Sequence, residues 1–149
     1  MKTFSVRFAT PEDRAEWLEM RLALWPHHTR QELLSEMDEI LANSAAQPVF
    51  IALGAGDQPC GFLEGGTRKY ADGCDTSPVG YIEGWFVKAD FRRQGVGEAL
   101  VRSMEDWVRA QGLLEIASDT WLDNETSILA HKKLGFLEKE KLVHFAKKL

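Results

Sequence analysis

A short segment rich in arginine and glycine, Arg92-Arg93-Gln94-Gly95-Val96-Gly97, could bind a phosphate group. It lies between a strand-like stretch and a helix-like stretch. The first turn of a helix presents unpaired backbone N–H groups and a partial positive charge. Glycine lets the backbone approach a ligand closely, and arginine pairs with phosphate oxygens. The segment therefore predicts a pyrophosphate site, although a plain helix start with two exposed arginines fits the same residues.

Other nucleotide-binding motifs do not fit the chain. No Gly-x-x-x-x-Gly-Lys-Ser/Thr segment is present, which argues against a P-loop nucleotide hydrolase. Gly54-Ala55-Gly56 follows a strand-like stretch, but Pro59 stands at the third glycine position of the dinucleotide fingerprint. A strand-like stretch follows it, where that fingerprint needs a helix.

A second set of residues could bind and deprotonate a cation. Glu83 lies inside an otherwise apolar strand-like stretch, where a carboxylate costs free energy unless it is paired or wetted. Its spacing predicts that it shares a strand face with Trp85 and Val87. Asp119 follows another apolar strand. Exposed edge positions and turns explain such carboxylates equally well. Further candidates are Asp72, Asp75 and Asp123 among the carboxylates, and Trp25, Tyr70 and Trp121 among the rings.

The elements that must position these residues follow from capping signals and apolar periodicity. We expect one domain over residues 1–149, of the α/β (α+β) class with a central mixed sheet. The expected strands are 3–9, 49–53, 61–67, 79–87, 114–118 and one or two within 136–147, and the expected helices are 10–25, 29–41, 96–112 and 124–134.

Composition narrows the class of protein. Hydrophobic residues make up 44% and charged residues 28% of 149 residues, as in ordinary globular proteins. The net charge of −5 argues against nucleic-acid binding and permits a cationic partner. No apolar run reaches the length of a membrane span, and no signal peptide is apparent, so we expect a cytoplasmic protein without a membrane partner.

The histidines and cysteines indicate no metal or covalent chemistry. Neither His27-His28 nor the isolated His131 and His144 have zinc-ligand spacing, so no metal site is expected. Cys60 and Cys74 are more simply reduced thiols than a bridge, which the sequence leaves open, and neither has an evident base partner.

The motifs resemble those of a known superfamily, the GCN5-related N-acetyltransferases. Arg92-x-x-Gly95-x-Gly97 is similar to its Gln/Arg-x-x-Gly-x-Gly/Ala signature, and Leu134-Gly135-Phe136 is similar to its second coenzyme A segment. The resemblance implies a splayed, mostly antiparallel mixed sheet flanked by about four helices, with acetyl-coenzyme A as cosubstrate in the gap. The implied coenzyme A contacts are Phe86, Val87, Arg92, Arg93, Gln94, Gly95, Val96, Gly97, Glu98, Ala99 and Asn124.

A closer resemblance, to aminoglycoside 6'-N-acetyltransferases, is spread over the acceptor side of the chain. The segments that carry it are Leu24-Trp25-Pro26, Tyr70, Gly73-Cys74-Asp75-Thr76-Ser77-Pro78, Glu83-Gly84 and Ala117-Ser118-Asp119-Thr120. It implies acetylation of an aminoglycoside, a cationic amino sugar, and with it antibiotic resistance. The implied acceptor residues are Trp25, Tyr70, Glu83, Asp119 and Glu140.

The resemblance also implies roles in the reaction. Glu83 would hold or deprotonate the attacking amine, and the Val87 N–H would polarise the thioester carbonyl. His131 stands where the superfamily often has a tyrosine general acid, and it could be an acid or a spectator. The family often forms dimers, so we expect a homodimer. The alternatives are a polyamine, peptide or small-metabolite acceptor, or a coenzyme A sensor without turnover.

Overall fold

In the computed structural model, residues 4–149 are described, and their core is one mixed sheet. The strands are β1 (Ser5–Phe8), β2 (Val49–Leu53), β3 (Pro59–Arg68), β4 (Val79–Val87) and β5 (Ile116–Ser118). They lie side by side in chain order; β1 to β4 are antiparallel, and β5 runs parallel to β4. Thr3, the expected start of the first strand, lies outside the described residues.

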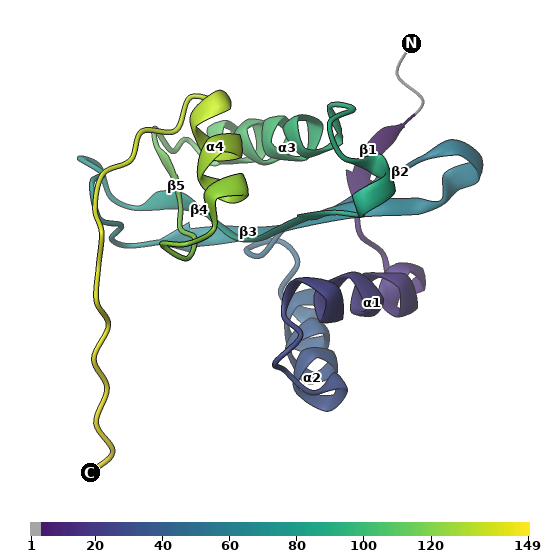
Figure 1. Cartoon of the computed structure of the whole chain (residues 1–149), viewed down its shortest axis with the longest axis horizontal. Coiled ribbons are helices and arrows are strands. Elements are labelled where there is room, and N and C mark those ends of the chain that lie inside the picture. The colour runs from purple at the N-terminus through teal and green to yellow at the C-terminus, as the bar shows by residue number, and fades with distance from the viewer. Residues whose placement is uncertain (1–3) are drawn as a thin grey trace.

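Helices cover both faces of the sheet (Figure 1). The helices α1 (Arg14–Leu24) and α2 (Arg30–Ala42) lie on one face, and α3 (Val96–Ala110) and α4 (Glu125–Lys133) lie on the other. Trp17, Leu33 and Met37 fill the core under the first pair, and Leu100 and Met104 anchor the core under α3. The predicted fold class, including the mixed sheet and the helices around it, is confirmed.

The helix starts follow from local capping. The Thr29 hydroxyl accepts a hydrogen bond from the Glu32 N–H at 3.1 Å, and the Glu32 carboxylate accepts one from the Thr29 N–H at 3.0 Å. This capping box satisfies N–H groups that have no partner inside the helix. At the start of α4, the Asn124 side chain accepts from the Ser127 N–H at 3.1 Å. The first start was predicted from these residues; for the second, the sequence allowed Asn124 or Thr126 as the cap, and the structure has Asn124.

The expected splay of the sheet is present between β4 and β5. The two strands pair only where Gly80, Tyr81 and Ile82 face Ile116, Ala117 and Ser118. β4 continues to Val87 beside β3, while β5 ends at Ser118. The last five residues of β4 therefore have a neighbouring strand on one side only.

The prediction of a final strand within residues 136–147 is wrong. The chain leaves α4 and runs extended along one end of the sheet and away from the body, with no strand pairing (Figure 1). A β-strand needs a partner backbone, and the path of this segment does not bring it beside β5 of its own chain. We call residues 137–149 the tail; Val143 is 76% exposed and Phe145 92%.

Three further features of the described residues concern membrane spans, metal ligands and cysteines. No helix in this part of the chain is long and apolar enough to span a membrane. Over residues 4–149, no group of three or more histidine, cysteine, aspartate or glutamate side chains is placed to hold a metal ion. Cys60 and Cys74 are both free thiols.

Candidate active site

The arginine–glycine turn has the backbone geometry of an anion site. Gly95 caps α3 with φ of 88°, a left-handed conformation that favours glycine. The Ala99 N–H donates to the Gly95 carbonyl at 3.0 Å, which is the first hydrogen bond of the helix. The N–H groups of the residues just before Ala99 therefore have no acceptor within the helix. Gly97 lies close to the Trp85 ring. A Cβ at this position would be 3.2 Å from the ring, which is tighter than ordinary contact. The start of α3 is thus open to a phosphate.

The backbone of β4 offers a hydrogen-bond donor toward the splayed gap. The Lys88 N–H donates to the Cys60 carbonyl of β3 at 2.8 Å. Polar groups alternate along an antiparallel strand, so Phe86 also turns its N–H toward β3 and Val87 turns its own away. Arg92 Nε donates to the Val87 carbonyl at 2.9 Å, on that outer side. Of the two expected pantetheine contacts, Val87 has the free backbone donor.

Side chains from α4 and β4 border the same gap. His131 packs edge-on against Trp85, with ring centroids 5.2 Å apart. Its Nδ1 lies 2.7 Å from the Ser127 carbonyl, and its Nε2 lies 2.8 Å from Ser118 Oγ. A carbonyl only accepts, so Nδ1 carries the proton and the Nε2 of neutral His131 accepts from the Ser118 hydroxyl. The indole Nε1 of Trp85 is buried without a hydrogen-bond partner among the described residues.

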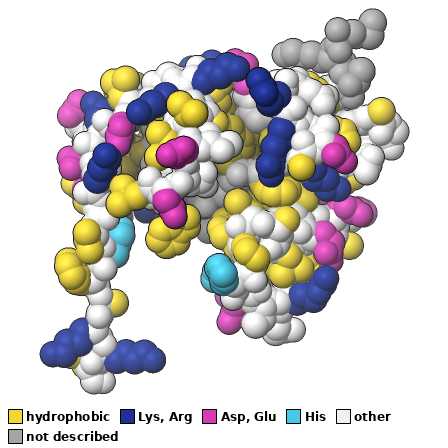
Figure 2. Space-filling model, in the orientation of Figure 1, with side chains coloured by type: hydrophobic (Ala, Val, Ile, Leu, Met, Phe, Trp, Pro, Cys, Tyr) yellow, Lys and Arg dark blue, Asp and Glu magenta, His cyan; other side chains and the backbone are white. Residues whose placement is uncertain are grey.

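These observations fit a coenzyme A group. An orphaned donor, a free strand edge and an open helix N-terminus are what a pantetheine arm and a pyrophosphate need. Figure 2 shows a recess between α4 and the turn before α3, with lysine and arginine side chains along the side formed by the turn. The Asn124 carbonyl oxygen, an expected coenzyme A contact, is already bound to Ser127 as a helix cap, which leaves its NH2 group for a ligand.

Glu83 occupies a β-bulge, which changes its expected direction. Glu64 of β3 faces Gly84 and Gly65 faces Ile82, so Glu83 is the extra residue of β4. A bulge breaks the alternation of side chains. Trp85 and Val87 pack into the cluster with α3, whereas both oxygens of Glu83 bind Arg68, at 3.0 and 2.8 Å. The prediction that Glu83 shares a face with Trp85 and Val87 is therefore wrong.

Asp119 and Glu83 are connected by the side chains of Tyr81 and Arg68. The Tyr81 hydroxyl donates to Asp119 at 2.5 Å. The Arg68 guanidinium lies over the Tyr81 ring, with Cζ 3.5 Å from its centroid. Burial, followed by the hydrogen bond to Asp119, raises the pKa of Tyr81 far above its ordinary value, so the phenol stays a donor. We call Arg68, Tyr81, Glu83 and Asp119 the acidic cluster.

Trp25 forms an aromatic wall next to this cluster. Its ring lies on the backbone of Gly84, where the absence of a side chain leaves room for it. A Cβ at Gly84 would be 2.6 Å from the ring. The Arg21 guanidinium lies 4.9 Å from the ring centroid. Arg21 is buried and binds the buried Glu64 at 2.8 and 3.0 Å. Burial raises the pKa of the Glu64 carboxyl, and the hydrogen bonds from Arg21 and Trp17 oppose that rise.

Tyr70 lies within electrostatic range of Glu140 of its own chain. Tyr70 is 71% exposed and donates to Asp72 at 3.0 Å. That hydrogen bond raises the pKa of Tyr70, and the charge of Glu140 adds to the rise. The Glu115 carboxylate accepts from the N–H groups of Asp75 and Thr76 at 2.8 and 2.6 Å, which ties the loop between β3 and β4 to the residue before β5. Tyr70 is thus two residues from Arg68 on an anchored loop.

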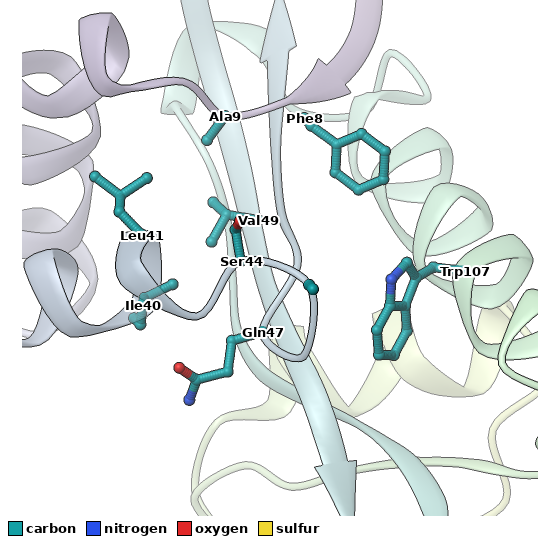
Figure 3. A pocket seen from close by; sticks show the side chains of 9 residues that line it. Phe8, Ala9, Ile40, Leu41, Ser44, Gln47, Val49 and Trp107 are labelled. Carbon is teal, nitrogen blue, oxygen red and sulfur yellow. The ribbon is translucent and has the colours of Figure 1, made fainter.

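A separate hollow of about 300 Å³ lies away from the acidic cluster. The rings of Phe8 and Trp107 stand on one side of it and Ile40 and Leu41 on the other (Figure 3). No charged side chain lines it. A polycation would find no counter-charge there, so the recess at β4 remains the candidate site.

Four residues at the site were not predicted: Arg21, Glu64, Arg68 and Tyr81. Glu64 carries the same signal that singled out Glu83, a carboxylate within an apolar strand. Arg68 and Tyr81 could have been found only from the strand register, in which Arg68 faces Val79 and Gly66 faces Tyr81. No sequence signal joins Arg21 to Trp25 and Glu64.

Comparison with known proteins places this geometry among acetyltransferases. The model of the Acetyltransferase (GNAT) family matches residues 14–136. An aminoglycoside N(6')-acetyltransferase type 1 from Klebsiella aerogenes is 44% identical over 146 residues, 97% of this chain and 96% of that protein. A protein of the same name from Stenotrophomonas maltophilia is 39% identical over 142 residues, 95% of this chain and 91% of that protein.

A solved structure also resembles this chain over nearly its whole length. The structure of AAC(6')-Iy in complex with the bisubstrate analogue CoA-S-monomethyl-acetylneamine superposes with a TM-score of 0.92 and 34% identity. The match covers 98% of this chain and 99% of that one. The two chains therefore share the fold over nearly their full length.

Proposed function

The chain belongs to the GNAT family of acetyltransferases, and we propose that it transfers the acetyl group of acetyl-coenzyme A to the 6'-amino group of aminoglycosides. The acidic cluster carries the proposal: two carboxylates and an aromatic ring gather beside the strand edge that would hold the thioester. A polyamine sugar needs such counter-charges. Relatives named for this activity at 44% and 39% identity support it.

The chemistry is direct attack of the amine on the thioester in a ternary complex. An alkyl amine of pKa about 10 is protonated at pH 7, and freeing its lone pair costs about 4 kcal/mol at about 1.36 kcal/mol per pKa unit. Glu83 accepts that proton, directly or through water. The Val87 N–H, turned away from β3, donates to the developing oxyanion. The C–N bond forms, the C–S bond breaks, and holding both reactants in place supplies much of the rate.

Proton return to the sulfur involves the pair of Ser118 and His131. The thiol leaving group has a pKa of about 8.5, so it needs little acid assistance. The Ser118 hydroxyl lies between the end of β5 and the His131 ring, at 2.8 Å from Nε2. We place His131 in its imidazolium form as the acid: its Nε2 proton passes to the Ser118 oxygen as the Ser118 hydroxyl proton passes to the thiolate, which leaves neutral His131 and the thiol. Water is the alternative donor, and replacement of His131 decides between them.

The tail supports a homodimer. β5 is one of the two edge strands of the sheet and pairs only with β4. The tail is extended (Figure 1), and Val143 and Phe145, two residues apart, expose their side chains. An open edge and an unpaired apolar segment of the same chain are the two halves of a strand exchange between copies. We propose that the tail of one protomer covers the β5 edge of its partner, with Glu140 beside an acceptor site.

Sedimentation measures this directly. We expect a dimer at micromolar concentration, and a monomer for the double variant Val143→Asp, Phe145→Asp. The control is Leu129→Asp, which also adds a charge at an exposed apolar residue, on α4. A monomeric parent chain contradicts the proposal.

The acceptor assay tests the function itself. Thiol release from acetyl-coenzyme A is measured with kanamycin, tobramycin, spermidine and a short peptide. We expect release with the aminoglycosides, and mass spectrometry to place the acetyl group on the 6'-nitrogen. Release with spermidine or the peptide alone would make the acceptor a different amine. Binding of acetyl-coenzyme A without release from any amine would indicate a sensor.

Resistance and location form the last part of the proposal. We propose a cytoplasmic enzyme, since Cys60 and Cys74 are free thiols, as the cytoplasm favours. Expression of the chain in a sensitive bacterium should raise the inhibitory concentration of kanamycin. Glu83→Gln, expressed to the same level, should not.

A further inference from the structure

The carboxylate of Glu83 binds a cation of its own chain. Arg68 Nε donates to Oε1 at 3.0 Å, and Nη2 donates to Oε2 at 2.8 Å. Arg68 is the last residue of β3 and faces Val79, and its side chain reaches along β4 to the bulge residue Glu83. Both side chains are 44% exposed, so the pair is open to solvent and to a ligand. Arg68 takes part in no step of the proposed reaction.

The surroundings of Arg68 are those that recognise an ammonium group. Its guanidinium carbon lies 3.5 Å from the centroid of the Tyr81 ring, within the range of a cation–π contact. The Tyr81 hydroxyl binds Asp119, which sets a second carboxylate at the far end of the ring. The hydrogen bond to Glu83 raises the pKa of Arg68, and the charge of Asp119 adds to that rise. One cation thus has a carboxylate partner, an aromatic face and a further negative charge.

We propose that Arg68 is a displaceable internal cation, which fills the ammonium subsite formed by Glu83 and Tyr81 and leaves it when the acceptor binds. The inference rests on the proposed function, since it identifies Glu83 as the group that meets the amine. Arg68 binds both oxygens of Glu83, and a substrate ammonium placed beside the guanidinium would be repelled by it, so the two cations compete for the carboxylate. An ion pair this exposed is weak, which allows a substrate to open it.

Displacement makes Arg68 a determinant of acceptor specificity. An acceptor must supply enough binding free energy to replace the guanidinium before its amine reaches Glu83. A polycationic amino sugar does so because a second ammonium group can bind Asp119, the other carboxylate of the acidic cluster. A simple monoamine has no such additional contacts, so the internal cation excludes it. Arg68 therefore raises the KM of every acceptor by about the same factor, and this places the KM of a weakly bound monoamine beyond measurement.

The test is the kinetics of Arg68→Gln with kanamycin and with a monoamine, glucosamine. We expect the kanamycin KM to fall about threefold to tenfold, which is about 0.7 to 1.4 kcal/mol at about 1.4 kcal/mol per tenfold change. Turnover of glucosamine should become measurable, and the KM of acetyl-coenzyme A should not change. Arg68→Lys keeps the charge and should keep the parent selectivity.

The chain contains a matched control. Arg14 binds Asp38 in the same two-bond geometry, at 3.1 and 3.0 Å, with 44% of its side chain exposed, between α1 and α2. Arg14→Gln removes an equivalent pair and should leave both acceptor KM values unchanged. Thermal denaturation of both variants measures any loss of stability common to such pairs.

The opposite kinetic result overturns the inference. If Arg68→Gln raises the kanamycin KM or lowers kcat, and Arg68→Lys restores it, then Arg68 positions Glu83 instead of competing for it. Unchanged acceptor KM values also overturn it. Thiol release by the parent enzyme with aminoglycosides distinguishes these outcomes from failure of the proposed function. Without thiol release from aminoglycosides in the parent, that function is wrong and the inference falls with it.

Discussion

Replacing Gly84 with alanine should weaken use of the acceptor while leaving use of acetyl-coenzyme A intact. Gly84 follows the bulge residue Glu83 and lies under the Trp25 ring. A Cβ at this position would lie 2.6 Å from Cη2 and 2.9 Å from Cζ2 of that ring. Carbon atoms pack at about 3.5 Å or more, so the ring must retreat by about 1 Å.

The size of the effect follows from how firmly Trp25 is held. Phe62 packs against its edge, with ring centroids 6.2 Å apart, and Arg21 lies over its face. The ring cannot retreat without disturbing the buried pair of Arg21 and Glu64. Misplacement of a substrate by about 1 Å costs up to about 100-fold in rate. We expect kcat/KM for kanamycin to fall by about 10-fold to 100-fold, which is about 1.4 to 2.7 kcal/mol.

Steady-state kinetics with each substrate varied in turn measure this effect. The matched control is Gly66→Ala on β3, where a Cβ would meet only the Ala46 carbonyl oxygen, at an ordinary 3.7 Å. That variant should behave as the parent. Overpacking alone costs about 1 to 3 kcal/mol of stability, so thermal denaturation accompanies the kinetics. If Gly84→Ala loses stability but keeps the parent KM and kcat for kanamycin, Trp25 does not belong to the acceptor site.

Three further changes probe the cofactor turn, the proton route and the first helix. Gly95→Ala, at φ of 88°, strains the cap of α3 by about 1 kcal/mol and should raise the KM of acetyl-coenzyme A about fivefold, whereas Gly112→Ala, at φ of 76° beyond the same helix, should not. His131→Ala should lower kcat at least about tenfold, and unchanged turnover across the pH range would remove His131 from the proton route. The Arg7 guanidinium lowers the pKa of Asp13, so its stabilisation is present above the unfolded pKa and is lost as the pH falls through the folded pKa. In urea, Asp13→Asn should therefore cost about 1 kcal/mol at pH 7 and converge with the parent near pH 2.

Elements with local signals could be predicted from the sequence, and nearly to the residue. Val49–Leu53 and Val79–Val87 are strands with the expected bounds, and α2 begins at the capping box of Thr29 and Glu32. Each of these signals lies within a few residues of the element it defines. The tail had apolar, strand-like residues too, but its pairing depends on a partner edge that local sequence does not specify.

Glu64 and Glu83 show why the site could be predicted only in part. Both are glutamates within apolar strands, and sequence reasoning assigns the same cost to each. In the structure Glu64 is buried and bound by Arg21 and Trp17, whereas Glu83 is exposed and bound by Arg68. The difference arises from the bulge between Glu64 and Gly65, which shifts the register by one residue. A shift of this kind leaves no mark in residue type or spacing.

The two halves of the site depend on different parts of the chain. In the proposed site, the cofactor half consists of backbone: the open start of α3, the left-handed Gly95 and the N–H of Val87. The proposed acceptor half consists of side chains from several elements, with Trp25 supported by the ion pair of Arg21 and Glu64. Backbone geometry tolerates side-chain changes elsewhere in the fold. Substitutions at Trp25, Arg68 or Asp119 should therefore change which amine is acetylated without abolishing the binding of acetyl-coenzyme A.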